Sequence, residues 1–284
     1  MTTPRIQPLR LTLLGMLALA LTAALAIVPG RMFHASAQPP AAKPTIVLVH
    51  GAWADASSWS AVTQRLQALG YNVVAPANPL EGLSTDSATI SDFLQTIPGP
   101  IVLVGHSYGG AVITNAATGN ANVKALVYVD AYIPDQGDTV FGLTAAQPGS
   151  CVGADAFNLV PFPGAPSGDA DTFLKVGPNK TYPGFASCFA NGLSSQEAAL
   201  LAASQRPAAL SAGTEPSGPP AWKQIPSWDL IGTADHVIPP AEQLFMAHRA
   251  GAHITEVNAG HLSLISHPTA AVGIILSAVQ ATTH

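Results

Sequence analysis

Charged residues are scarce in this sequence of 284 residues, because Asp, Glu, Lys and Arg together make up 10% of it, against about 25% in an average globular domain. The 11 basic residues are spread along the chain without forming a block, which argues against a nucleic-acid partner. The formal net charge is −5, and 48% of the residues are hydrophobic. This composition and length predict a packed protein of one large or two small domains rather than a disordered chain.

Motifs for metals and nucleotides are also missing. None of the nine histidines belongs to an H-E-x-x-H motif or to a Cys/His cluster, so we expect no metal site. No P-loop and no G-x-G-x-x-G motif follows an apolar run that could be a strand, which argues against a nucleotide cofactor. The sequence therefore predicts a protein that works without a cofactor.

Cysteine occurs only twice, at Cys151 and Cys188. Both lie in the same irregular region, and a disulfide between them would hold that region together in an oxidising compartment. Two unpaired thiols are the alternative. We predict the disulfide, because both cysteines lie in one region of the sequence and the protein is expected in an oxidising compartment.

The first 37 residues differ from the rest of the chain. Arg5 and Arg10 precede an uncharged apolar stretch, Leu11–Val28, and a small-x-small site ends at Ala37. This order predicts an export signal, although the apolar stretch is also about long enough to span a bilayer. We therefore expect a periplasmic or secreted protein. The alternative is a protein held at the membrane by an uncleaved N-terminal anchor, which would be its only membrane contact. In both cases a folded domain follows over residues 38–284.

Short apolar runs alternate with helix-like segments from Thr45 onward. Trp59, Val62, Leu66 and Leu69 recur at the spacing of one helix face. Strands that are apolar throughout, each followed by a helix, predict an α/β fold with a mostly parallel six-stranded sheet and helices on both faces. The predicted strands are Thr45–Val49, Tyr71–Ala75, Ile101–Val104, Ala125–Val129, Ser227–Gly232 and His253–Val257.

The alternation stops between the fourth and fifth predicted strands. From Pro134 to Pro226 the chain is rich in Pro, Gly and Ala and has no clear periodicity. One helix is predicted there, where Ser194 and Glu197 have the spacing of a capping box. A segment of about ninety residues is far longer than an ordinary connection. We predict that residues 134–226 form a cap insertion.

A serine, an aspartate and a histidine each follow a predicted strand. Ser107 lies in the sequence GHSYG after the third strand, Asp235 follows the fifth and His261 the sixth. Ligands bind at the carboxyl ends of parallel strands, and a histidine held by a carboxylate can take the proton of a serine hydroxyl. The G-x-S-x-G pattern is typical of a sharp strand-to-helix turn that exposes the serine. We predict that these three residues are catalytic.

Two backbone amides are expected to stabilise an oxyanion. One is the amide of Tyr108, at the start of the helix after the serine, and the other is that of Ala52, after the first strand. Trp53, beside it, is a candidate substrate contact. Arg206 ends the helix in the insertion, where it either holds a polar or anionic substrate at the pocket mouth or is a solvated helix end favoured by the helix dipole.

Four segments of the chain resemble the α/β-hydrolase fold: HGAWADASSW, GHSYGG, IGTADHVIPP and AGHLSLISHP. They look most like the branch of plant methyl esterases and hydroxynitrile lyases, with its bacterial relatives. The resemblance covers the chain from Thr45 to the last helix and implies a Ser107–Asp235–His261 triad without a cofactor. Too little sequence precedes Thr45 for the two antiparallel strands that open larger members.

Other residues compete for these roles. Asp130 follows the fourth strand, where some hydrolases carry the acid, but Asp235 lies in the expected G-x-x-D loop. Asp130 is then expected to order the base of the insertion. His253 begins a strand and His267 precedes a proline, so both have ordinary structural roles.

The function expected is that of an exported carboxylic ester hydrolase acting on a small-molecule substrate through an acyl-enzyme. A hydroxynitrile lyase is the first alternative, but such lyases carry Thr and Lys where this chain has Gly51 and Leu262. A perhydrolase would use the same triad, and a ligand-binding protein could keep the fold.

Overall fold

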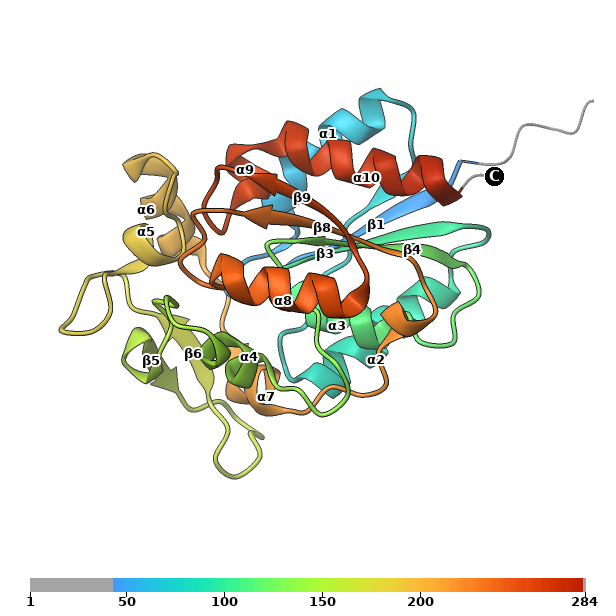
Figure 1. The fold of residues 1–284 in the computed structure, drawn as a ribbon. Coiled ribbons are helices and arrows are strands. Elements are labelled where there is room, and N and C mark those ends of the chain that lie inside the picture. Colours follow the sequence, from blue (N-terminus) through green and yellow to red (C-terminus); the bar gives the residue numbers. More distant parts are fainter. Residues whose placement is uncertain (1–42, 283–284) are drawn as a thin grey trace, which may run out of the picture. The chain divides into compact units, whose positions relative to one another are not determined.

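The computed structural model describes residues 43–282, and these contain a six-stranded sheet in the order β2-β1-β3-β4-β8-β9 (Figure 1). All of its neighbouring strands pair in parallel. The predicted fold class is therefore confirmed, and the expected signal or anchor lies outside the described residues. The strands are β1 Thr45–Val49, β2 Val73–Val74, β3 Ile101–His106, β4 Val123–Val129, β8 Ser227–Gly232 and β9 His253–Val257.

The central strands are buried along almost their whole length. Every residue of β1, β3 and β8 is buried, and in β4 only Lys124 is exposed. The edge strands β2 and β9 are more accessible to solvent. This pattern follows from helices covering both faces, since a strand buried on both sides can be apolar throughout.

Helices α1 and α10 cover one face of the sheet, and α2, α3 and α8 cover the other (Figure 1). In α1 the predicted residues Val62 and Leu66 are buried, but Leu69 is 50% exposed. The prediction for Leu69 is wrong because α1 ends at Ala68 and the chain turns at Gly70, which has φ +77°. The bounds are α1 Ser60–Ala68, α2 Leu83–Gln95, α3 Tyr108–Ala116, α8 Pro240–Ala250 and α10 Pro268–Thr282.

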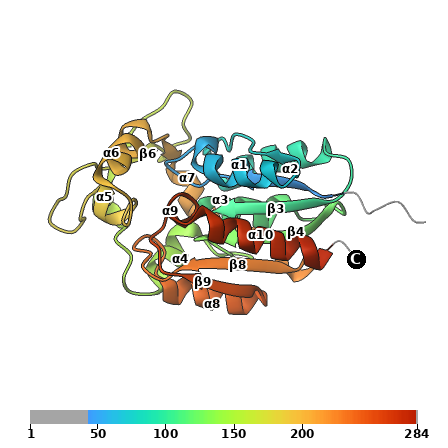
Figure 2. The ribbon, with the colours of Figure 1, turned by 90° about the horizontal axis from the view of Figure 1, so that it is seen from above.

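The insertion between β4 and β8 lies beyond the carboxyl ends of the sheet strands (Figure 2). It contains the predicted helix α6, whose Ser194 and Glu197 form the expected capping box. It also contains a small antiparallel sheet, β5-β6-β7, that the sequence did not predict. Most of β5 is exposed and β7 has two residues, so neither produces a clear alternating pattern. The bounds are β5 Phe157–Val160, β6 Asp171–Leu174, β7 Ala208–Ala209, α4 Val140–Ala146, α5 Phe185–Cys188, α6 Ser195–Ser204 and α7 Leu210–Thr214.

The remaining elements are single turns. They are the helix α9 Ser263–Ser266 and the 3₁₀ helices η1 Ala56–Trp59, η2 Ala154–Ala156 and η3 Ala221–Lys223. Within residues 43–282, none of the helices has the length and apolar character needed to cross a bilayer.

Cys151 and Cys188 face each other across the insertion. Their Cα atoms are 5.8 Å apart, a separation that suits a disulfide. Cys151 and the residue before Cys188 both contact the loop that follows β8. The Cys151 amide donates to the His236 carbonyl, and the His236 ring donates to the Ser187 carbonyl. A disulfide here would hold two parts of the insertion against this loop.

We expect the two cysteines to resist alkylation until a reductant is added, since a disulfide leaves no free thiol. The variant with both Cys151→Ser and Cys188→Ser should lose about 2–4 kcal/mol of unfolding free energy, because the open loop gains chain entropy when unfolded. Intact mass after alkylation, with and without reductant, and urea unfolding check these outcomes. Alkylation of both cysteines in the untreated protein would show that the disulfide does not form.

Asp229 is a fully buried carboxyl group in the middle of β8. Neither of its oxygen atoms has a hydrogen-bond partner in the part of the chain that the structure describes. Burial raises its pKa well above the ordinary value of 3.8, because the charged form is costly without water. The folded state therefore holds this proton more tightly than the unfolded chain. The stability that results is present below about pH 4 and is lost as the pH rises.

We expect Asp229→Asn to raise the unfolding free energy at pH 7 and to change it little near pH 4. The gain should grow with pH by up to about 1.4 kcal/mol per unit, the limit for one proton. Urea unfolding between pH 4 and pH 8 measures this dependence. The exposed Asp92 on α2 provides the control Asp92→Asn. An Asp229→Asn effect that is the same at every pH would contradict the prediction.

Candidate active site

Ser107 lies on a strained turn between β3 and α3. Its backbone has φ +54° and ψ −125°, a region that costs energy for a residue with a side chain. A Cβ atom on Gly105 would lie 2.5 Å from the Gly109 carbonyl oxygen, and one on Gly109 would lie 2.5 Å from the Val49 carbonyl oxygen. Glycine is thus required at both positions for the turn to close against β1.

Ser107, His261 and Asp235 form a continuous chain of hydrogen bonds. The His261 Nε2 atom is 2.9 Å from Ser107 Oγ, and the His261 Nδ1 atom is 2.8 Å from Asp235 Oδ2. All three side chains are buried. The structure therefore brings together the three residues that the sequence singled out, in the order in which a proton would leave the serine.

The Asp235 carboxylate is oriented by its own loop. Its Oδ1 atom accepts from the amides of Val237 and Ile238, at 2.7 and 3.0 Å. Its Oδ2 atom accepts from Gln243 Nε2 at 2.8 Å in addition to facing His261. These donors fix the rotation of the carboxylate, so that Oδ2 is the oxygen presented to the histidine.

Asp130, the competing acid, makes different contacts. Its Oδ1 atom accepts from the Gly232 amide at 2.8 Å, and its Oδ2 atom accepts from the Ser263 amide at 3.0 Å. Asp130 thus connects the loops that carry Asp235 and His261, whereas the sequence interpretation placed it at the base of the insertion. Burial raises its pKa well above the ordinary range, and the nearby Asp235 raises it further.

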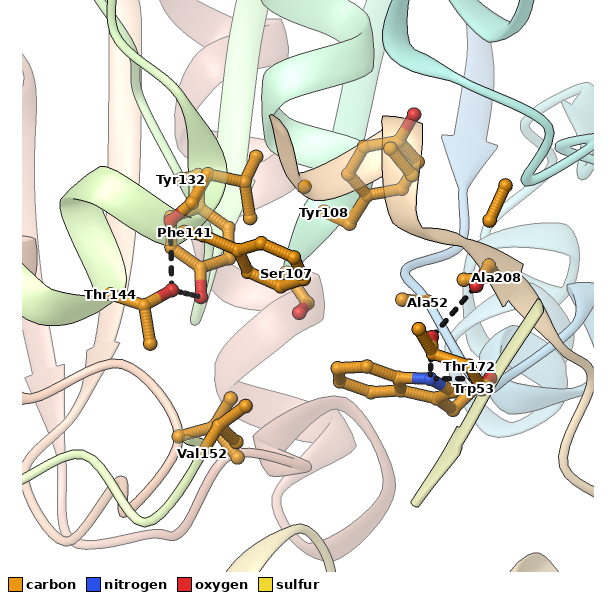
Figure 3. A pocket seen from close by; sticks show the side chains of 15 residues that line it. Ala52, Trp53, Ser107, Tyr108, Tyr132, Phe141, Thr144, Val152, Thr172 and Ala208 are labelled. Atoms are coloured by element: carbon orange, nitrogen blue, oxygen red, sulfur yellow. Dashed lines mark hydrogen bonds between the residues drawn. The ribbon is translucent and has the colours of Figure 1, made fainter. Parts of the chain in front are cut away.

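The expected oxyanion amides lie beside the serine. Tyr108 is the first residue of α3, and the first amides of a helix have no partner within it. The Tyr108 ring points away from Ser107 (Figure 3), and its hydroxyl donates to Asp86 Oδ2 at 2.6 Å. Ala52 follows β1 in a loop that touches the serine, since a Cβ on Gly51 would lie 2.7 Å from Ser107 Cβ. Ala52 and Tyr108 thus line the same cavity as Ser107.

Two buried histidines hold the loops around the site. His50 Nδ1 donates to the Gly51 carbonyl, and its Nε2 accepts from the Asn78 amide. His106 Nε2 donates to the carbonyl of His261 at 2.9 Å. Burial lowers the pKa of both rings, which keeps them neutral and suits these contacts. These histidines therefore position the loop after β1, which carries Ala52, and the loop after β9, which carries His261.

A small cavity of about 30 Å³ adjoins Ser107 (Figure 3). Trp53 forms part of its wall, and its indole nitrogen donates to the carbonyl and hydroxyl oxygens of Thr172 at 3.1 Å. The Trp53 ring also contacts Phe157 and Phe189. The rest of the wall is mostly apolar and includes Ala52, Tyr132, Val140, Phe141, Ala208, Ala212 and Val237.

Arg206 is half-buried and is not among the residues that line this cavity. Its charge acts on the neighbouring loop instead. A hydrogen bond from Ser57 lowers the pKa of Asp55, and the Arg206 charge lowers it further. The Arg206 charge thus acts on Asp55, which lies in the loop after β1 that also carries Ala52 and Trp53. Over residues 43–282 there is no group of three or more His, Cys, Asp or Glu side chains that could hold a metal ion.

Sequence reasoning missed several residues of the pocket. Tyr132 follows β4, Phe141 and Thr144 lie on α4, and Thr172 lies on the unpredicted strand β6. No local motif marks them. The only available signal was the position of Tyr132 shortly after the fourth strand, where the chain leaves the sheet.

Comparison with known proteins identifies the family. A sequence profile described as the alpha/beta hydrolase family matches residues 46–273. An esterase that hydrolyses carbendazim, from Nocardioides sp. (strain SG-4G), is 34% identical over 110 residues, which are 34% of this chain and 46% of that enzyme. This match thus spans less than half of the enzyme. An alpha/beta hydrolase of Aspergillus novofumigatus (strain IBT 16806) is 28% identical over 263 residues, which are 83% of this chain and 96% of that protein.

The solved structures agree with this assignment. A methylesterase from Arabidopsis has a TM-score of 0.67 and 18% identity, and the match covers 84% of this chain and 99% of that one. At this identity the similarity concerns the fold. The resemblance to esterases of this fold that the four sequence segments indicated is confirmed. The chain belongs to the alpha/beta hydrolase family.

Proposed function

We propose that this protein is an exported, cofactor-free serine hydrolase that cleaves small-molecule carboxylic esters through an acyl-enzyme. The main support is the unbroken hydrogen-bond chain from Ser107 through His261 to Asp235. A relative named as an esterase and the alpha/beta hydrolase family point to the same reaction class.

In the first half of the proposed reaction, Ser107 Oγ attacks the carbonyl carbon of the ester while His261 Nε2 takes the serine proton. The carbonyl oxygen becomes an oxyanion, which accepts hydrogen bonds from the amides of Ala52 and Tyr108. The tetrahedral intermediate then collapses, and the bond to the alcohol breaks. His261 gives its proton to the departing alcohol, which leaves the acyl group bonded to Ser107.

The second half repeats these steps with water. His261 takes a proton from the water molecule as its oxygen attacks the acyl carbon, and the proton returns to Ser107 when the acid leaves. Asp235 accepts from His261 Nδ1 throughout, so that Nε2 is free to act as the base. The Asp235 charge also stabilises the imidazolium that forms in each half.

The lyase alternative fits this site less well. A lyase of this branch would carry threonine in place of Gly51, but a Cβ atom at this position would lie 2.7 Å from Ser107 Cβ. A threonine side chain would therefore require Ser107 or its neighbour His106 to shift. Leu262 is buried and apolar where such a lyase would carry a lysine.

Export is the second part of the proposal. It rests on the composition of the first 37 residues and on the facing pair Cys151 and Cys188, which suits an oxidising compartment. The N-terminal sequence of the protein recovered from the periplasm or medium tests it. A start near residue 38 is expected, and recovery only from the cytoplasm would contradict export.

Hydrolysis of p-nitrophenyl acetate together with labelling by diisopropyl fluorophosphate tests the reaction. We expect turnover of the ester, one phosphoryl adduct per chain, and loss of activity in proportion to labelling. Peptide mass spectrometry should place the adduct on Ser107. Turnover that persists after complete labelling, or an adduct on another residue, would contradict the mechanism.

A further inference from the structure

Phe141 lines two cavities. The inner cavity adjoins Ser107 and has a volume of about 30 Å³. A second cavity of about 420 Å³ is lined entirely by residues of the insertion, among them Phe157, Leu159 and Leu210. Phe141, together with Thr144 and Val152, lines both. The two spaces therefore meet at this ring.

Two other elements of the insertion hold the ring in place. A Cβ atom on Gly213 in α7 would lie within 2.6 Å of three carbon atoms of the Phe141 ring, so the ring rests directly on the glycine backbone. On another side the ring contacts Phe157 of β5, with 5.9 Å between centroids, and Phe157 in turn contacts Trp53 at 5.6 Å. Phe141 is thus fixed between α7 and β5.

The inner cavity has room for only a small group. A water molecule needs about 10–15 Å³ in this measure, so 30 Å³ holds about two atoms of that size, as in a methyl or ethyl group. Apart from Ser107, the residues in its wall that carry a hydroxyl group already donate it to other groups. Tyr132 donates to Thr144 Oγ1, Thr144 to the Val140 carbonyl, Thr172 to the Ala208 carbonyl and Tyr108 to Asp86 Oδ2. The wall therefore suits a small, uncharged, apolar group.

The outer cavity suits a larger group that is also uncharged and apolar. Its volume falls within the range of pockets that hold drug-sized ligands, and Phe141, Val152, Phe157, Leu159 and Leu210 make its wall apolar. This space and the one at Ser107 are two cavities whose walls share Phe141, Thr144 and Val152. Because Phe141 has the largest of these three side chains, we expect removal of its ring to join the two.

We propose that Phe141 sets substrate choice by limiting one substituent of the ester, acyl or alcohol, to about two carbon atoms. The preferred substrates are then uncharged esters with one short substituent, and loss of the ring extends that substituent into the outer cavity. This inference rests on the proposed ester hydrolysis at Ser107.

The test measures kcat/KM for two series of substrates. In one series the acyl group of p-nitrophenyl esters grows from two to eight carbons, and in the other the alcohol of a fixed acid grows over the same range. We expect the wild-type value to fall at least about tenfold between two and six carbons in one series, in line with the cost of one or more ill-fitting methylenes. In Phe141→Ala this fall should disappear or reverse.

Phe245→Ala is the matched control, because Phe245 lies on α8 and is 50% exposed. This variant removes the same atoms and should keep the wild-type length limit. A wild type without a limit in either series, or a limit that persists in Phe141→Ala, would overturn the proposal. Failure of the proposed function looks different, since p-nitrophenyl acetate would then not be hydrolysed, or its hydrolysis would persist after complete labelling of the protein.

Gly213→Ala tests the same contact from the other side. Its added methyl group must displace the Phe141 ring, so we expect at least about a tenfold lower kcat/KM for the two-carbon ester. In the Phe141→Ala background the methyl group has room, and its effect should fall to less than about threefold. Thermal melts of each variant confirm folding. Equal effects of Gly213→Ala in both backgrounds would show that this contact does not control the site.

Discussion

Ser107→Ala is expected to lower kcat for ester hydrolysis by about 10⁴- to 10⁶-fold and to leave the fold intact. Without Oγ no acyl-enzyme can form, and only the weak activity of water held near the oxyanion amides remains. Stability should change by about 1 kcal/mol or less, because the variant loses only the hydrogen bond to His261. Alanine adopts the same positive φ as serine, so the strain of the turn stays the same.

This prediction is checked with p-nitrophenyl acetate, urea unfolding and a control on the same chain. Ser277→Ala removes an exposed hydroxyl on α10 that donates to the Gly273 carbonyl, and the activity of this variant should match the wild type. Ser107→Ala should also fail to react with diisopropyl fluorophosphate. Activity within tenfold of the wild type in Ser107→Ala would exclude this serine as the nucleophile.

Asp235→Asn is expected to lower kcat by about 10⁴-fold, as the loss of the correct histidine tautomer does in a serine triad. The two loop amides of Val237 and Ile238 require an acceptor, so the asparagine oxygen should occupy the Oδ1 position. The asparagine NH₂ group would then face His261 Nδ1 and the Gln243 amide. His261 would have to accept at Nδ1 and carry its proton on Nε2, where it could no longer take the serine proton.

Asp130→Asn is the informative comparison for this variant. The asparagine side chain keeps an acceptor for only one of the Gly232 and Ser263 amides. The variant should therefore weaken the connection between the loop that carries Asp235 and the loop that carries His261. Because Asp130 makes no hydrogen bond to His261 within the described chain, we expect a loss of about tenfold. Measuring kcat/KM for both variants gives the ranking. A larger loss in Asp130→Asn than in Asp235→Asn would assign the acid to Asp130.

The sheet could be predicted from the sequence because its signals are local. The apolar run Ile101–Val104 lies within the observed β3, and Thr45–Val49 is β1 itself. Parallel pairing brings the carboxyl ends of such strands to one edge. For this reason residues that directly follow separate strands, Ser107 and His261 among them, could be expected to meet.

Other details depend on contacts that no local pattern contains. Helix periodicity placed Leu69 on a buried face, but the helix ends one residue earlier. The role of Asp130 follows from amides at Gly232 and Ser263, which are far from it in the sequence. Its position after a strand could suggest a functional carboxylate, but could not indicate which groups it binds.

By itself the sequence determined the fold class and the identity of the residues at the strand ends. Both follow from local patterns, because buried strands are runs of consecutive apolar residues and turns depend on a few neighbouring residues. Only the tertiary structure decided the form of the pocket. There Thr172 on β6 pairs with Ala208 on β7, and Phe141 rests on Gly213. These partners come from separate parts of an insertion that has little periodicity. The space beside the serine therefore depends on how those parts pack together.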